Sequence, residues 1–217
     1  DTCYVRINTY TALDGLSGPV DEGILSYTVI AAVTVSARVD PSFTFVVGPV
    51  NSGVTTNGVT TSVTSTFATL PFGNLTPGTP KYAAHTLTVT TNTVGGYTVS
   101  ARMAQQMTGV YAGNDIDPYT AAWTAPASWV EPTGDTPNTN TGWFGANTND
   151  KDVTGWTAAN TEGLFAGIGA TANQVMRGSA SDDGSISVTV SYALEVNVFQ
   201  PADTYNGRLQ YNAVATY

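Results

Sequence analysis

Side chains able to support catalysis are scarce in this sequence. His85 is the single histidine and Cys3 the single cysteine among 217 residues, so any Ser–His or Cys–His pair would depend on His85. No Gly-x-Ser-x-Gly turn accompanies it, and it precedes an alternating run, which favours a hydrogen-bonded residue at a strand start. Glu131 and Glu162 are of the type that glycosidases pair, but their spacing does not place them opposite each other. We interpret both as surface acids and expect no catalytic site.

Two loops carry alternating oxygen side chains of the kind that Ca²⁺ prefers. Neither has the glycine and glutamate offsets of an EF-hand loop, so turns closed by side-chain hydrogen bonds are favoured and bound Ca²⁺ is the alternative. Asn74 begins the only Asn-x-Thr glycosylation sequon, and Pro77 directly after it disfavours modification. The oxygen-bearing residues are Asp115 and Asp117 in the first loop, and Asn147, Asn149, Asp150 and Asp152 in the second.

All four tryptophans fall within residues 105–180, among Pro, Gly, Asn and Asp residues. Flat aromatic faces suit the stacking of sugar rings. A loop-rich segment also needs a secondary hydrophobic core to stay ordered, and Trp is enriched in subunit interfaces. The sequence leaves these three interpretations open. The residues concerned are Trp123, Trp129, Trp143 and Trp156.

Composition excludes several functional classes. The formal net charge is −9, and the 7 Lys and Arg residues are too few to displace the counterions of nucleic acid. One Cys and one His cannot form a disulfide framework or a His/Cys zinc site. No run of about 18 apolar residues predicts a membrane helix. The chain begins at Asp1 with neither Met nor a signal-like apolar stretch, so we interpret it as a processed protein, secreted to the cell surface or beyond.

The elements that would position these residues are predicted to be β-strands. Apolar and polar residues alternate over residues 186–198, and a shorter run of the same kind covers residues 33–39. The pair Gly95-Gly96 separates two further runs and predicts a tight hairpin. We predict an all-β protein, a Greek-key or jelly-roll-like sandwich formed by residues 21–217, with a long irregular Trp-rich excursion at about residues 105–180.

Three stretches of the chain resemble known proteins. They are residues 33–45; residues 72–99, with the motifs F-G-N-L-T-P-G, H-T-L-T-V-T-T-N and G-G-Y-T-V; and residues 200–217, which begin Q-P-A-D-T-Y-N-G. Together they cover about half of the chain and are similar to prokaryotic secreted β-sandwich surface proteins of the fimbrial or pilin-like, spore-coat and WxL-like kinds. The resemblance implies a cell-surface location, and its motifs mark strands and turns rather than a ligand site.

The first functional hypothesis is a structural subunit of an extracellular filament, pilus or surface layer, whose partner is a further copy of itself. Residues 1–20 would donate a strand to the neighbour by β-augmentation, with Cys3, Val5 and Ile7 filling its groove and the segment around Gly15 as tether. The 36 threonines give strand surfaces polarity with little charge, which favours contact between identical subunits. The alternative is a carbohydrate-binding or adhesive module that binds surface glycans through the Trp residues.

Overall fold

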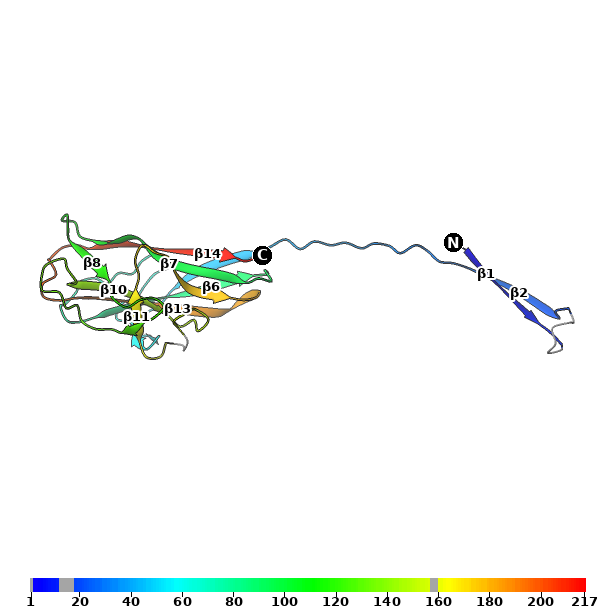
Figure 1. The fold of residues 1–217 in the computed structure, drawn as a ribbon, viewed down its shortest axis with the longest axis horizontal. Helices are drawn as coiled ribbons and strands as arrows, with labels where there is room; N and C mark the ends of the chain where they lie inside the picture. Colours follow the sequence, from blue (N-terminus) through cyan, green and yellow to red (C-terminus); the bar gives the residue numbers. More distant parts are fainter. Residues whose placement is uncertain (1, 12–17, 157–159) are drawn as a thin grey trace. The chain divides into compact units, whose positions relative to one another are not determined.

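The computed structural model describes residues 2–11, 18–156 and 160–217. The chain divides into two compact units, Asp1–Asp40 and Pro41–Tyr217 (Figure 1). This boundary lies later in the chain than the predicted one after residue 20, so residues 21–40 belong to the first unit rather than to the sandwich. Gly15, expected in a tether, lies outside the described residues.

The first unit contains a hairpin and no core. Strand β1 (Thr2–Thr9) pairs antiparallel with strand β2 (Asp21–Thr28). Every described residue of this unit is exposed except the half-buried Asn8. Residues 33–39 do not form the predicted strand, because no strand of the described chain pairs with them; Figure 1 draws them as an open trace. A two-stranded hairpin without a core is marginally stable by itself.

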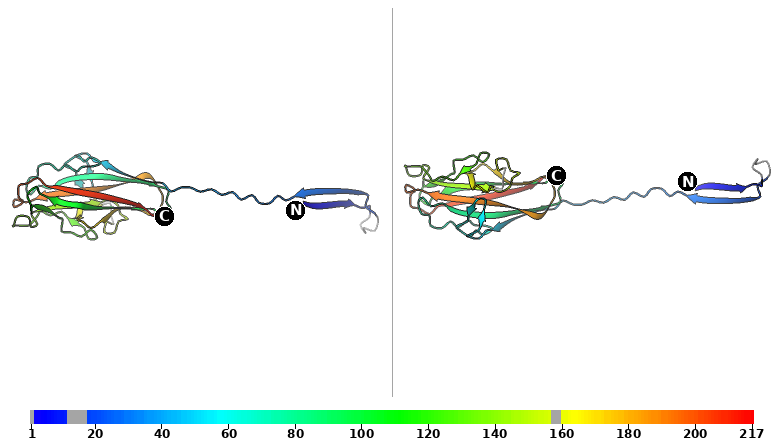
Figure 2. Two further views of the ribbon diagram at one scale, coloured as in Figure 1. Left: turned by 90° about the horizontal axis from the view of Figure 1, so that it is seen from above. Right: turned by 90° about the horizontal axis from the view of Figure 1, so that it is seen from below.

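The second unit is the all-β sandwich that the alternation predicts (Figures 1 and 2). No helix occurs among the described residues, and so none there has the length and apolar character to cross a membrane. The strands are β3 (Phe43–Pro49), β4 (Thr55–Thr56), β5 (Val59–Thr60), β6 (Lys81–Thr91), β7 (Tyr97–Thr108), β8 (Asp115–Pro118), β9 (Ala127–Ser128), β10 (Gly142–Thr148), β11 (Leu164–Gly167), β12 (Asn173–Gly178), β13 (Asp182–Val196) and β14 (Asn206–Ala215).

The strands of the second unit form two layers that are joined at one corner. One layer has the order β3-β6-β13-β10-β11, and the other has the order β12-β7-β14. Strand β8 pairs with β7 and with β10, so it connects the layers. The core between them contains the fully buried Leu87, Val89, Val99 and Val190. Pairing can be followed from β3 through β6, β13, β10, β8 and β7 to two end strands, β12 and β14, which both pair with β7. One path of paired strands therefore ends at β3 and β14, and these two strands do not pair with each other.

The Gly95-Gly96 turn connects the two layers. Gly96 has a φ of 76°, which glycine adopts without steric cost, so the turn is confirmed. The predicted hairpin is wrong, because β6 pairs with β3 and β13, whereas β7 pairs with β8, β12 and β14. The apolar faces of β6 and β7 bury against each other in the core, and the chain crosses from one layer to the other at this turn.

The Trp-rich excursion covers the outer face of β13. Residues Ser191, Ala193 and Glu195 alternate with the apolar row and are expected to face solvent, yet all three are buried. A second hydrophobic core lies against this face. It explains how the excursion keeps a defined structure although it contains no long strands. Its buried members are Tyr119, Trp143, Phe165 and Ala193.

Candidate functional site

The side of the sandwich between β3 and β14 is open. In the described chain each of these strands pairs with one neighbour only, so each has a free edge. The ring of Phe45 on β3 meets the ring of Tyr211 on β14 edge to face, with centroids 6.1 Å apart. The two free edges therefore lie beside each other. We call this side, bounded by β3 and β14, the open flank.

The inward-facing residues of the open flank are incompletely buried. Alternate residues of β3 and β14 pack against the core but remain half-buried, whereas Leu87 of β6 and Val99 of β7 have no exposed surface. A strand at an edge is shielded by a neighbour on one side only, which explains this difference. The half-buried residues are Phe43, Phe45, Val47, Leu209, Tyr211 and Ala213.

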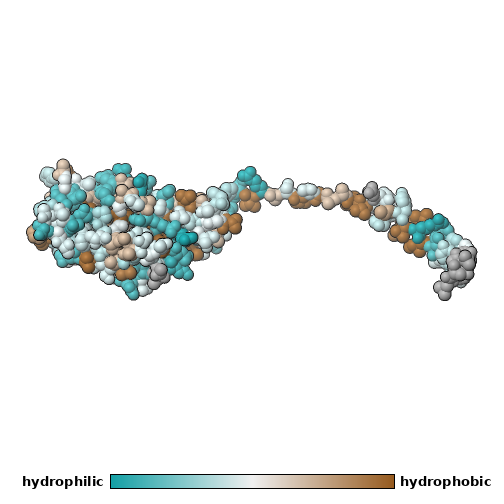
Figure 3. Space-filling view, in the orientation of Figure 1, coloured by the Kyte–Doolittle hydropathy of each residue, from teal (hydrophilic) through white to brown (hydrophobic). Residues whose placement is uncertain are grey.

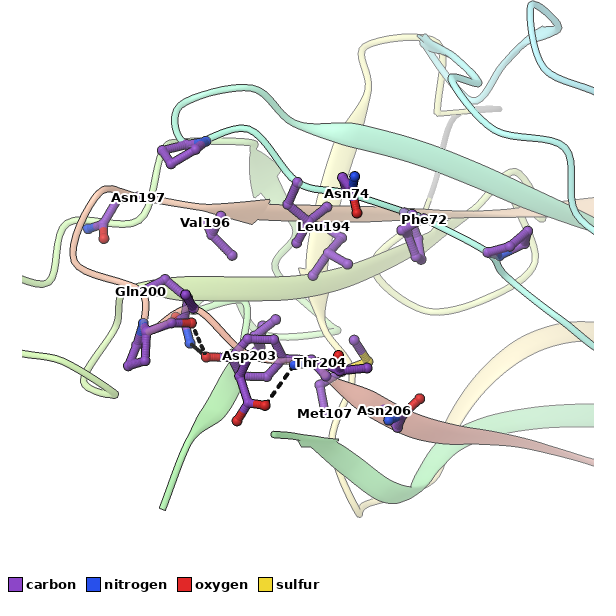
Figure 4. A pocket seen from close by; sticks show the side chains of 18 of the residues that line it. Phe72, Asn74, Met107, Leu194, Val196, Asn197, Gln200, Asp203, Thr204 and Asn206 are labelled. Carbon is purple, nitrogen blue, oxygen red and sulfur yellow. Dashed lines mark hydrogen bonds between the residues drawn. The ribbon is translucent and has the colours of Figure 1, made fainter. Parts of the chain in front are cut away.

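A groove continues the open flank beyond the end of β3. Its first part, of about 410 Å³, lies between residues 67–72 and residues 205–211. Its second part, of about 720 Å³, lies between residues 70–77 and residues 200–206 and is drawn in Figure 4. Both parts are lined by Leu70, Phe72, Met107, Tyr205 and Asn206, so the groove is continuous.

The polar side chains of the groove hold its own walls together. Gln200 Nε2 donates a hydrogen bond to the hydroxyl of Tyr205 at 2.7 Å (Figure 4). It also donates to the backbone oxygen of Asp115 at 2.8 Å. The carboxylate of Asp203 accepts a bond from the backbone N–H of Tyr111 at 2.9 Å. The exposed Asn74 of the sequon stands on the opposite wall. The groove thus offers apolar contacts and no arrangement of a nucleophile beside a base.

His85 lies under the open flank with both ring nitrogens engaged. Its Nε2–H donates to the backbone oxygen of Thr66 at 2.8 Å, because a carbonyl can only accept. Its Nδ1 therefore accepts the hydroxyl hydrogen of Tyr211 at 3.1 Å. The hydroxyl of Tyr211 also bonds to that of Tyr192. Burial lowers the pKa of His85. These contacts match the structural histidine that the sequence favours, but the expected position at a strand start is wrong, because β6 begins at Lys81 and His85 lies within it.

The lowered pKa of His85 predicts a loss of stability in mild acid. Burial disfavours the charged imidazolium in the folded state, so the unfolded state takes up the proton more readily. The stabilising contribution is complete above the unfolded pKa of about 6.5 and is lost as the pH falls toward the lower folded value. Urea unfolding at several pH values should show this decline, and it should be weaker in His85→Gln. Equal slopes in both proteins would contradict the prediction.

Three of the four tryptophans are buried. Trp123 and Trp156 pack together in the main core with ring centroids 4.9 Å apart, and Trp143 belongs to the second core. The half-buried Trp129 stacks on Tyr119, with centroids 4.6 Å apart and an angle of 25° between the rings. These positions favour the interpretation as a secondary core over that of a sugar-stacking platform.

Sugars are therefore expected to leave the intrinsic tryptophan fluorescence unchanged. Three indoles are buried and the fourth is already stacked on a tyrosine, so a pyranose ring finds no free indole face. The measurement is a titration of the intact protein with cello- and chito-oligosaccharides. Unfolding in guanidinium provides the control, because it should change the emission strongly. A saturable emission change with any of these sugars would support the glycan hypothesis.

The oxygen side chains of the second loop accept hydrogen bonds from the protein. Asn147 Oδ1 accepts bonds from two protein donors, and Asn149 Oδ1 accepts the backbone N–H of Thr189 at 2.8 Å. The carboxylate of Asp150 accepts the backbone N–H of Asp152 at 2.9 Å. The Asp150 bond closes a local turn of the kind that the turn interpretation expects, whereas Asn147, on β10, and Asn149 accept bonds from segments distant in sequence. In the part of the chain that the structure describes, no three His, Cys, Asp or Glu side chains gather as a metal-binding group.

Sequence reasoning overlooks Glu195. It occupies an outward position of an alternating strand, and its burial comes from the excursion that packs over that face. Trp129 Nε1 donates to Glu195 Oε2 at 2.5 Å. Burial raises the pKa of Glu195, and the charge of Glu131 adds to the rise. Glu131 is thus within electrostatic range of Glu195. Glu162, the candidate catalytic partner of Glu131, is an exposed residue elsewhere in the excursion.

The residues suggested as a donor strand lie on one face of the hairpin. Cys3, Val5 and Ile7 are all exposed on β1. In the register of the hairpin, Cys3 lies opposite Tyr27 and Val5 lies opposite Leu25, so this face is apolar. Strand β1 is paired with β2 along its whole length, and therefore it is not a free single strand.

No protein family model matches the chain, and no curated protein sequence does. The resemblance of three stretches to prokaryotic secreted β-sandwich surface proteins therefore stays an expectation. The open flank, the groove and the exposed first unit are the features from which a function can be argued.

Proposed function

We propose that this protein is a structural subunit of an extracellular filament or cell-surface layer, in which copies join by β-strand complementation. The observation that carries the proposal is the open flank, where the two ends of the strand path lie beside each other without pairing. Exposed edge strands pair readily with a strand of another chain. An added strand on this side would pair with β3 and β14 and cover their half-buried inward residues.

The first unit supports the same proposal. It has no core, and its described residues include large exposed apolar side chains, among them Tyr4, Ile24, Leu25 and Ile30 at 61–83 % exposure. Exposed apolar surface of this extent in a soluble protein marks a site of interaction. Strand complementation needs a donor segment outside the sandwich and an acceptor position with free strand edges inside it, and this chain has both.

The chemistry of the groove supports a structural role over a catalytic one. The titratable side chains that line it, apart from tyrosines, are His85, Asp203 and Arg208. His85 is engaged with Thr66 and Tyr211, and Asp203 anchors a loop. The low charged fraction of 11% also leaves much of the strand surface uncharged and therefore easier to desolvate in a contact. We therefore assign the protein no enzymatic activity and no cofactor.

Electron microscopy of the purified full chain tests the proposal. Negatively stained samples prepared at increasing concentration should contain regular fibres or sheets, and sedimentation velocity should detect oligomers that grow with concentration. The same samples in strong denaturant should contain only monomers, which excludes covalent aggregation through Cys3. A protein that remains monomeric and monodisperse at every concentration would contradict the assignment as an assembly subunit.

A further inference from the structure

Residues 29–40, at the end of the first unit, have the alternating pattern of a strand with one apolar face, and residues 29–39 form no strand in the described chain. Even positions become polar from Thr34 onward, while the odd row stays apolar throughout. Val33, Val35 and Val39 are each more than 80 % exposed, and Figure 3 shows apolar side chains along this segment in brown. A strand with one wholly apolar face is stable only when that face is covered. The odd row consists of Val29, Ala31, Val33, Val35, Ala37 and Val39.

The open flank has the properties of the missing partner. Natural edge strands usually carry charges, prolines or bulges that prevent pairing with other chains. Strand β3 contains no charged residue, and its proline, Pro49, stands at its last position. Strand β14 contains one charged residue, Arg208, and the two register shifts in its pairing with β7 lie beside this residue, so the strand is regular from Leu209 onward. Both edges are therefore suited to accept a further strand.

The length of residues 29–40 matches the length of the open flank. Strand β14 has 10 residues and spans roughly 33 Å at about 3.3 Å per residue. The twelve residues 29–40 would span roughly 40 Å by the same rise. A strand of this length would pair along the whole flank and reach the first part of the groove, between residues 67–72 and β14.

The side chains agree as well. With the odd row facing inward, valines and alanines would cover the half-buried Phe45, Leu209 and Tyr211. These side chains are small enough to fit between two edges whose aromatic rings already touch. The even row would face solvent with Thr34, Ser36 and Arg38, as a surface row should.

We propose that residues 29–40 of one copy insert between β3 and β14 of a second copy. The inference rests on the proposed function and names its donor, in place of Cys3, Val5 and Ile7. Those residues belong to a strand that is already paired, whereas residues 29–39 pair with no strand of the described chain.

The connection to β3 favours a second copy over the same chain. Only Pro41 and Ser42 separate the donor segment from Phe43, where β3 begins. Ser42 is fixed at the end of β6, since its N–H donates to Asn92 Oδ1 at 2.7 Å and its oxygen accepts the hydroxyl of Thr91 at 2.9 Å. To enter its own flank, the chain would therefore have to reverse at Asp40 and Pro41, and proline is disfavoured at the second central position of a type I turn. Entry into a neighbour needs no reversal.

A matched pair of substitutions in the full chain tests the inference. Val35→Asp places a charge in the apolar row, and Thr34→Asp places the same charge on the opposite face of the same segment. Sedimentation velocity should show a concentration for half-assembly at least about tenfold higher for Val35→Asp, because a carboxylate is strongly disfavoured in an apolar interface. Thr34→Asp should assemble within about twofold of wild type. Circular dichroism should find both variants folded, since both positions are exposed.

The outcomes separate this inference from the function on which it rests. If wild type and Val35→Asp assemble equally well, the donor is wrong while the assembly function stands. If wild type stays monomeric and Val35→Asp lowers its unfolding temperature, the segment occupies its own flank and the second copy is excluded. If wild type stays monomeric and neither variant differs from it, both the function and the donor are excluded.

Discussion

Deletion of residues 1–40 is expected to abolish assembly and to leave a folded, monomeric sandwich. The deletion removes the proposed donor strand, while the two layers and both hydrophobic cores lie entirely within Pro41–Tyr217. We expect the concentration for half-assembly to rise by more than about a hundredfold, beyond the range of soluble protein. Sedimentation velocity and electron microscopy measure the assembly, and thermal unfolding should give a cooperative transition within a few degrees of that of the monomeric full chain.

A control distinguishes the two apolar parts of the first unit. Ile7→Asp charges the apolar face of the hairpin and leaves residues 29–40 intact. We expect this variant to assemble nearly as well as wild type, because β1 is already paired with β2. Loss of assembly in Ile7→Asp would return the donor role to residues 1–20. Fibres formed by the chain that lacks residues 1–40 would exclude the whole first unit as donor.

The substitution Phe165→Ala is expected to lower the free energy of unfolding by about 3–5 kcal/mol. Phe165 has no exposed surface; its ring stacks on Tyr82 with centroids 5.9 Å apart and meets Trp129 edge to face at 5.5 Å. Truncation of the Phe165 side chain would leave a cavity in the second core, which the irregular excursion forms against β13. Urea unfolding followed by circular dichroism measures the change.

Phe67→Ala is the matched control for this substitution. Phe67 is 75 % exposed, so its loss should change the free energy of unfolding by less than about 0.5 kcal/mol. If Phe165→Ala lowers the free energy of unfolding no more than Phe67→Ala does, the excursion does not depend on the second core. The Trp-rich segment would then have to be interpreted again as a binding surface.

The parts of the fold that the sequence predicts are those in which a local pattern suffices. The alternation around Val190 predicts a long strand, and β13 occupies that place. The pattern cannot name the partner of a strand, which is why residues 33–39 alternate in the same way without forming one. The pair Gly95-Gly96 predicts a turn correctly, but sequence gives no sign that its two strands enter different layers.

The candidate site was less accessible to sequence reasoning for a physical reason. The open flank exists because Phe45 and Tyr211, more than 160 positions apart, come together at two unpaired edges; no local pattern encodes that meeting. The burial of Glu195 likewise depends on a distant segment that packs over its strand. The abundance of Thr agrees with the all-β fold, since Thr is a residue that favours strands.

Amide hydrogen exchange of the assembled full chain tests strand complementation most directly, because it reports main-chain hydrogen bonds segment by segment. The reference is the Val35→Asp protein, which we expect to remain monomeric. Assembly should slow exchange in residues 29–40 of the donor and, at the same time, in β3 and β14 of the acceptor. An assembled sample in which residues 29–40 exchange as fast as in the monomeric variant would contradict this account.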